Sequence, residues 1–230
     1  INSAQAINPA LYKNPGFDPI NDFVPLYYIG ATPYVLVTPP GSPYKTLADV
    51  VAAAKKKPGE LSYASAGNGT ISHLLGAMLN TSAGIEMQHI PYKGVGPALT
   101  ALLANEVQFT VADAGAVPHI ASGRLRALSV LSANPSPLLA GVAGLSTSGI
   151  SDVDISSNLG ILAPAGTPAA ILDRLNSSLN RALAQDEIRA KLSGLGQMAA
   201  PRSRADFLRT LTNDVRRYSI VVKEAGIRID

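Results

Sequence analysis

The sequence predicts an α/β protein built from two lobes. Between residues 60 and 131, short segments with strand periodicity alternate with segments of helical periodicity, which is typical of right-handed βαβ units. Near-continuous apolar runs at 34–37 and 159–164, each bordered by prolines, flank this block. The block is therefore expected to be inserted between two parts of another domain, and the two crossings are expected to form a hinge.

The composition is that of a globular protein, because 47% of the 230 residues are apolar and can form a sizeable core. The net charge is +3 with only 15% charged residues, which favours no nucleic-acid partner. The run Lys55–Lys57 lies at the end of an expected helix and fits a solvated last turn. Cysteine is absent, which excludes disulfides and thiol catalysis.

The first 58 residues are predicted to form loops, two strands and one helix. Pro9–Tyr12 favours a short helical turn in a proline-rich stretch, and β-rich runs follow at 26–30 and 34–37. Thr46 and Asp49 have the spacing of a capping box, so we expect a helix that ends at Lys57.

The central block is predicted in detail from its hydrophobic periodicity. The expected strands are 61–65, 86–91, 107–112 and 124–131, and the expected helices are 70–81, 95–104 and 115–122. Residues 132–158 are rich in Pro, Gly and Ser and predict a long irregular connection.

The last third is predicted to be helical after a return strand at 159–164, which we expect to pair with 34–37. Helices are expected after Thr167-Pro168, at 187–194 and after the capping signal Ser203–Asp206. The predicted lobes are therefore 1–38 with 159–230, and 39–158.

A glycine-rich turn between the first strand and first helix of the block is the main candidate site. Gly67 and Gly69 permit backbone angles that other residues avoid, and Thr70 and Ser72 suit a first helical turn. The loop is expected to present free N–H groups to an anion, although a plain structural turn has the same pattern. It lacks the Lys of a phosphate loop and the further glycine of a dinucleotide site.

No set of residues predicts catalysis or metal binding. The three histidines match no metal-ligand spacing, and neighbouring Ser72 and His73 point about 100 degrees apart on a helix, so they are not a nucleophile and base. His73 is expected to pack or to cap. Asp113 either accepts a hydrogen bond from a ligand or caps the following helix, and Lys93 either attracts anions or is simply solvated.

Several runs in a fixed order closely resemble the Bug family, the extracytoplasmic solute receptors of tripartite tricarboxylate transporters. The runs are Tyr63–Leu74, His89–Gly94 with Pro97–Leu99, and Pro118–Leu128, together with Ala6–Tyr12, Asp22-Phe23 and Ile161–Pro168. Each run alone is a weak signal, but the ordered set is specific and covers essentially the whole chain.

The resemblance implies a type II periplasmic-binding-protein fold with a mostly parallel sheet in each lobe. It implies a periplasmic protein that captures a small carboxylate between the lobes and passes it to the membrane components of the transporter, without catalysis, cofactor or metal. The residues that match the family's ligand-binding loops are Ser3, Ala4, Ser65, Gly67, Asn68, Gly69, Thr70, Ser72 and Asp113.

Two departures from the family pattern affect these expectations. Ala114 stands where many members have asparagine, which removes one side-chain contact. The family's opening strand and carboxylate loop are absent before Ile1, so the first lobe is expected to be incomplete and ligand binding impaired. A homodimer is one way to cover the face of the first lobe that the missing opening segment would leave exposed. A sensor without a transport role is the alternative function.

Overall fold

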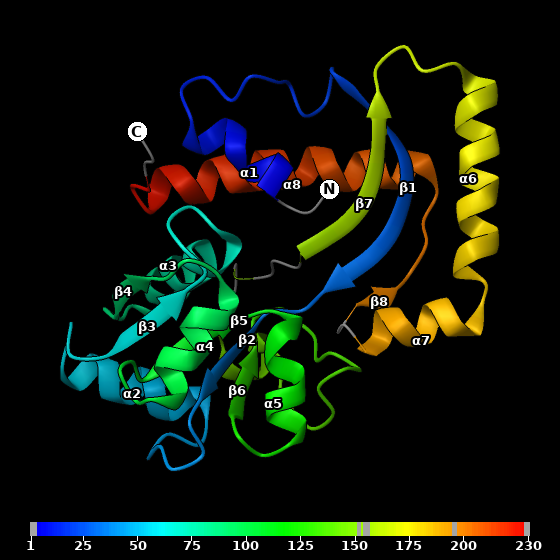
Figure 1. Cartoon of the computed structure of the whole chain (residues 1–230). Helices are drawn as coiled ribbons and strands as arrows, with labels where there is room; N and C mark the ends of the chain where they lie inside the picture. The colour runs from blue at the N-terminus through cyan, green and yellow to red at the C-terminus, as the bar shows by residue number, and fades with distance from the viewer. Residues whose placement is uncertain (1–3, 151–152, 154–156, 195–196, 228–230) are drawn as a thin grey trace. The chain divides into compact units, whose positions relative to one another are not determined.

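The computed structural model describes residues 4–150, 153, 157–194 and 197–227. The chain forms two compact units, one made of Ile1–Thr32 with Ser157–Asp230 and the other of Pro33–Ser156 (Figure 1). Strand β2 (Val35–Thr38), which the sequence assigns to the first lobe, belongs to the sheet of the second unit. All four of its residues are buried, which fits a central strand with a neighbour on each side.

The second unit contains a five-stranded sheet in the order β4-β3-β5-β2-β6. Strand β3 pairs in parallel with β4 and β5, whereas β2 pairs antiparallel with β5 and β6. One strand therefore runs against the other four, so the expected parallel sheet is correct only for those four. The remaining strands are β3 (Ser62–Ser65), β4 (Gln88–Pro91), β5 (Phe109–Ala112) and β6 (Arg126–Val130).

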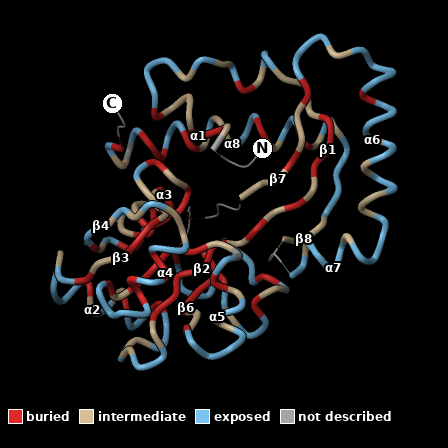
Figure 2. The backbone as a smooth tube through the Cα atoms, in the orientation of Figure 1, coloured by how far each residue is buried: buried red, intermediate tan, exposed pale blue. Residues whose placement is uncertain are grey.

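Helices cover both faces of this sheet because its side chains alternate. Ala64 packs in a core cluster with Ala98 and Leu102 of helix α4 (Val95–Leu103). Tyr63 points to the other face, where its ring lies against Gly76 of helix α3 (Ile71–Ala83). In Figure 2 strands β2, β3 and β5 are largely buried, whereas the edge strand β4 has no buried residue.

The remaining segments of the second unit match their local sequence signals. Helix α2 (Leu47–Lys56) begins with the expected capping box of Thr46 and Asp49. The expected helix 115–122 is shorter, since a 3₁₀ turn, η1 (Ala114–Ala116), precedes α5 (Val117–Ala121). A second 3₁₀ turn, η2 (Leu145–Ser148), lies within the irregular connection.

The first unit contains a three-stranded sheet in the order β7-β1-β8. Both pairings are antiparallel, so the mostly parallel sheet expected here is wrong for the described strands. Strand β7 (Ser157–Pro164) pairs with β1 (Phe23–Thr32) and not with β2 as predicted. The reason is that β1 carries the chain towards the second unit and β7 carries it back, so the two run side by side in opposite directions. Strand β8 is Met198–Ala199.

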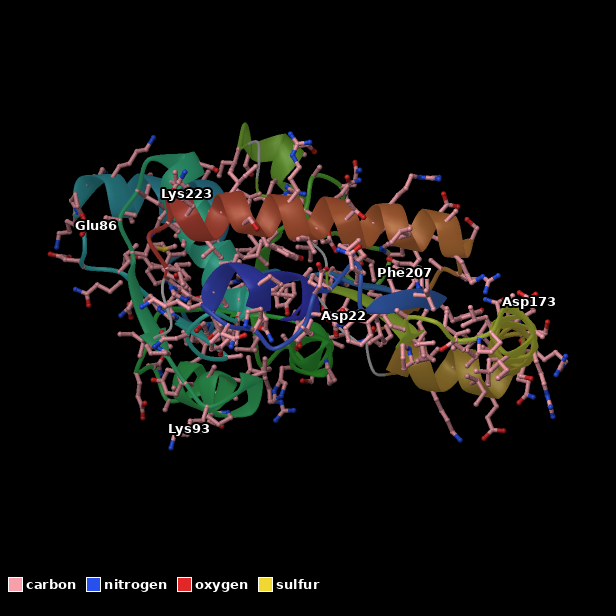
Figure 3. All side chains as sticks on the ribbon, turned by 90° about the horizontal axis from the view of Figure 1, so that it is seen from above. Asp22, Glu86, Lys93, Asp173, Phe207 and Lys223 are labelled. Carbon is pink, nitrogen blue, oxygen red and sulfur yellow. The ribbon has the colours of Figure 1, made fainter. Side chains whose placement is uncertain are left out.

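Helices α6 (Ala169–Leu183) and α8 (Arg204–Glu224) both contact β1, and α1 (Ala4–Leu11) packs on α8. Helix α8 begins at the expected cap, where Ser203 Oγ accepts a hydrogen bond from Asp206 N–H. Phe207 lies against the sheet with its ring centroid 5.4 Å from that of Tyr28 (Figure 3). Helix α7 spans Asp186–Gly194. Among the described residues, no helix combines the length and apolarity needed to cross a membrane.

Candidate functional site

The candidate site lies at one edge of the sheet in the second unit. Parallel strands β3, β4 and β5 end at the same edge, which brings together the loops 66–70, 92–94 and 113–116 (Figure 1). The first two loops are joined directly, because Gly94 N–H donates to Ala66 O at 3.0 Å. Ligands of open α/β sheets bind at such carboxyl edges.

The two glycines predicted to shape the first loop are required by its geometry. Gly67 has φ +133° and Gly69 has φ +72°, both in the region that L-residues with side chains rarely adopt. A Cβ on Gly67 would also lie 3.1 Å from Tyr92 O. This part of the sequence interpretation is confirmed.

The loop's backbone donors, however, are mostly used within the protein. Ala66 N–H donates to Ser72 Oγ at 2.9 Å, Gly67 N–H to Ser65 Oγ at 3.1 Å, and Gly69 N–H to His73 Nδ1 at 3.1 Å. Thr70 N–H donates to Gly67 O at 3.3 Å. The expectation that the loop presents these N–H groups freely is therefore wrong, since neighbouring side chains compete for them.

The hydroxyl groups predicted as ligand contacts also point into the loop. Ser65 is completely buried and Ser72 is 1% exposed. Thr70 Oγ1 donates to Gly67 O at 2.7 Å and lies 3.0 Å from Ser72 Oγ. What faces outward is the exposed Asn68, next to the first turn of α3, where N–H groups have no partner within the helix.

The other predicted positions have different surroundings. Asp113 Oδ1 accepts from Gly115 N–H at 3.0 Å, and Asp113 O accepts from Ala116 N–H, so this residue forms the turn that opens η1. Lys93 is exposed and extends away from the ribbon (Figure 3). Ala4 begins α1 in the first unit, and Ser3 lies outside the described residues.

A pair of histidines behind the loop was not predicted as a unit. The rings of His73 and His89 are stacked, with centroids 3.8 Å apart and an angle of 8° between their planes. His89 Nε2 lies 2.6 Å from Ser65 Oγ. The parallel pairing of Tyr63 with His89 places His89 on the α3 face of the sheet, so a correct strand register would have revealed the pair.

Both histidines are held neutral near pH 7 by their environment. Burial lowers the pKa of His73, and burial followed by the proximity of His73 lowers the pKa of His89 to about 4. A serine hydroxyl beside a neutral histidine is also the geometry of a nucleophile and base, but Ser65 is buried beneath its own loop, where no substrate carbonyl reaches it. No cluster suited to a metal ion occurs among the described residues.

Two α/β units joined by two crossings, with a glycine-rich loop at a helix N-terminus, are the arrangement typical of two-lobed solute-binding proteins. The sequence pattern of the tripartite tricarboxylate transporter family receptor (TctC) matches residues 1–227, and the chain belongs to this family. It is therefore a member of a receptor family, not of an enzyme family, and the resemblance seen in the sequence is confirmed.

Relatives of the chain support the same assignment. A UPF0065 protein of Pseudomonas sp. is 35% identical over 196 residues, which cover 83% of this chain and 58% of the relative. The chain thus spans little more than half the length of that relative. A structure of an R. palustris protein with adipate matches with a TM-score of 0.88 and 28% identity, covering 100% of this chain and 78% of the other.

A second ligand-bound structure is MatC from Rhodopseudomonas palustris with bound malate. It matches with a TM-score of 0.83 and 25% identity, covering 96% of this chain and 77% of the other. These matches confirm the type II periplasmic-binding-protein fold expected from the sequence.

Proposed function

We propose that the chain is a periplasmic receptor that captures a small organic carboxylate and delivers it to the membrane components of a tripartite tricarboxylate transporter. The observation that carries the proposal is the family match over residues 1–227, joined with two similar structures that hold the dicarboxylates adipate and malate. The receptors of this family are periplasmic, which supports the proposed location.

The loop between β3 and α3 supports an anionic ligand. The N-terminus of a helix carries partial positive charge and free N–H groups, and here it adjoins the exposed amide of Asn68. We assign the ligand contacts of this unit to Asn68 and to the first turn of α3. Gly67 and Gly69 allow the backbone conformation of the loop. The hydroxyl groups of Ser65, Thr70 and Ser72 form hydrogen bonds within it. Asp113 forms the turn next to the loop. Ser3 and Ala4 remain proposed contacts from the family resemblance.

Thermal unfolding in the presence of a carboxylate panel tests this function. Malate, adipate, glutamate and benzoate are compared with adipamide, which keeps the length of adipate but carries no charge. A ligand present at 100 times its Kd stabilises the folded protein by about 2.7 kcal/mol. We expect at least one carboxylate to raise the Tm and adipamide to leave it unchanged.

A matched pair of variants locates the site. Asn68→Asp places a negative charge at the loop tip and is expected to abolish the shift by repulsion. Asn105→Asp makes the same change at an exposed position just after α4, before β5 begins, and is expected to keep the shift. A wild-type protein whose Tm responds to no carboxylate would count against the proposed function.

A further inference from the structure

The contact between Gly69 and His73 specifies the protonation state of His73. An imidazole nitrogen accepts a hydrogen bond only when it carries no proton. Gly69 N–H donates to His73 Nδ1 at 3.1 Å, so the ring must be neutral with its proton on Nε2. Protonation at Nδ1 would turn this attraction into a clash of two donors.

His89 supports the other end of the same loop through Ser65. Ser65 Oγ accepts from Gly67 N–H at 3.1 Å, and its own proton has two acceptors, His89 Nε2 at 2.6 Å and Gly67 O at 3.2 Å. When the proton of neutral His89 lies on Nδ1, His89 Nε2 accepts from the hydroxyl that holds Gly67. Through these contacts the stacked pair is linked to both glycines of the loop.

We propose that His73 and His89 are positioning residues for carboxylate binding, which as neutral acceptors hold the loop of residues 65–72 in its binding conformation and release it when the pair is protonated. The part of this proposal that concerns the ligand rests on the proposed function. The part that concerns the loop does not.

The surroundings of the pair favour the neutral state. The ionisable groups that face the rings are each other and Tyr63, whose ring centroid lies 5.2 Å from that of His89 and whose hydroxyl donates to His73 O. Within the described residues no carboxylate is hydrogen-bonded to either ring. A proton on either histidine thus gains no counter-ion and lies beside a second basic ring, which agrees with the lowered pKa of both.

Four variants separate positioning from simple packing. His73→Asn and His89→Gln each keep a neutral acceptor near the position of the nitrogen that is used, whereas His73→Leu and His89→Leu remove it. Circular dichroism establishes that each variant folds. If a leucine variant does not fold, the asparagine and glutamine variants still test the proposal through the pH dependence of amide hydrogen exchange in the loop.

The first measurement is amide hydrogen exchange of Gly67 and Gly69 without ligand. We expect exchange, corrected for its intrinsic pH dependence, to accelerate at least tenfold between pH 7 and pH 4 in the wild-type protein. The His73→Asn/His89→Gln double variant is expected to show no such acceleration. Equal behaviour of the two proteins would overturn the proposed role in the loop.

The second measurement is the Kd for malate and adipate at pH 7.5, where both histidines are neutral. At pH 7.5 we expect the leucine variants to bind at least tenfold more weakly and the asparagine and glutamine variants to stay within threefold of wild type. Leucine variants that bind like wild type would overturn the role in binding. If wild-type protein binds no carboxylate at pH 7.5, the proposed function fails, and the exchange measurement still decides whether the histidines hold the loop.

Discussion

At the scale of single residues, the close approach of Gly76 to Tyr63 makes a sharp prediction. A Cβ on Gly76 would lie 2.1 Å from Tyr63 Cε2, and the Tyr63 ring is buried between α3 and the sheet. We expect Gly76→Ala to lower the free energy of unfolding by about 1–3 kcal/mol because the core must rearrange, which outweighs the better helix propensity of alanine. Urea unfolding measures this change.

Gly96 in α4 provides the matched control. A Cβ at Gly96 meets no atom within 4 Å, so Gly96→Ala is expected to be neutral or to stabilise by up to about 1 kcal/mol. A Gly76→Ala variant as stable as Gly96→Ala would show that Tyr63 moves without cost.

Individual residues, in the site and elsewhere, could be predicted only where the constraint is local. The glycines at 67 and 69 and the caps at Thr46 and Ser203 follow from neighbours in the sequence, and the structure confirms them. The contact of Ser65 with His89 joins residues 24 apart, so it depends on strand register and could not be read from spacing alone.

At the scale of elements, a partly buried polar contact links α8 to the sheet of the first unit. Asp214 Oδ2 accepts from Asn158 Nδ2 at 2.6 Å, and Asn158 Oδ1 accepts from Tyr28 O–H at 2.7 Å. Burial raises the pKa of Asp214 to about 6, against the opposing effects of Asn158, Arg217 and Arg202. The charged carboxylate is therefore unfavourable in the folded state.

The sign of the pH dependence follows from proton binding. Between the unfolded pKa of 3.8 and the folded pKa of about 6, the native state holds more protons, so this group's contribution to stability falls as pH rises. Asp214→Asn removes the charge and is expected to stabilise the protein by about 1–3 kcal/mol at pH 7.5 and by clearly less at pH 4.5, because less of the charge-linked difference between the two states has developed there. Urea unfolding at both pH values checks this. A variant that is destabilised at pH 7.5 would mean that the nearby arginines favour the charged form.

Element type was easier to predict than strand direction. Every strand and helix expected between 60 and 131 is present, because their periodicity is a local property. The antiparallel pairs that β2 makes with β5 and β6, and β1 with β7, depend on where the chain crosses between units. A parallel arrangement was inferred from alternation of strands and helices, which contains no information on the flanking strands.

At the scale of the whole molecule, the inserted arrangement could be inferred from two proline-bordered apolar strands, although the first crossing lies before β2 and not after it. The place of the candidate site could be predicted, because one loop of the second unit contains most of the residues that match the family's ligand-binding loops, but the roles of its N–H and hydroxyl groups could not, since they depend on contacts within the folded loop. In the first unit, Ala4 begins α1 and Ser3 lies outside the described residues.

The second unit is a continuous segment, residues 33–156, and we expect it to fold alone. It has its own core cluster, which includes Val35, Leu102 and Val130, and its own five-stranded sheet. Its first strand, β2, lies between β5 and β6, and Leu131 N–H donates to Tyr34 O at 2.8 Å, so the first and last strands are joined. A segment of this size with one core is within the range of independent domains.

A fragment of residues 33–156 is therefore expected to unfold cooperatively in urea and to give a dispersed amide spectrum. The control is residues 33–120, which lacks β6 and so removes one of the two neighbours of the fully buried β2. We expect this shorter fragment to lose cooperative unfolding and to bind a dye for exposed apolar surface, because a buried edge strand cannot leave its backbone groups unpaired. If the longer fragment also behaves in this way, the core of the second unit is insufficient by itself, and its fold depends on the segments that make up the first unit.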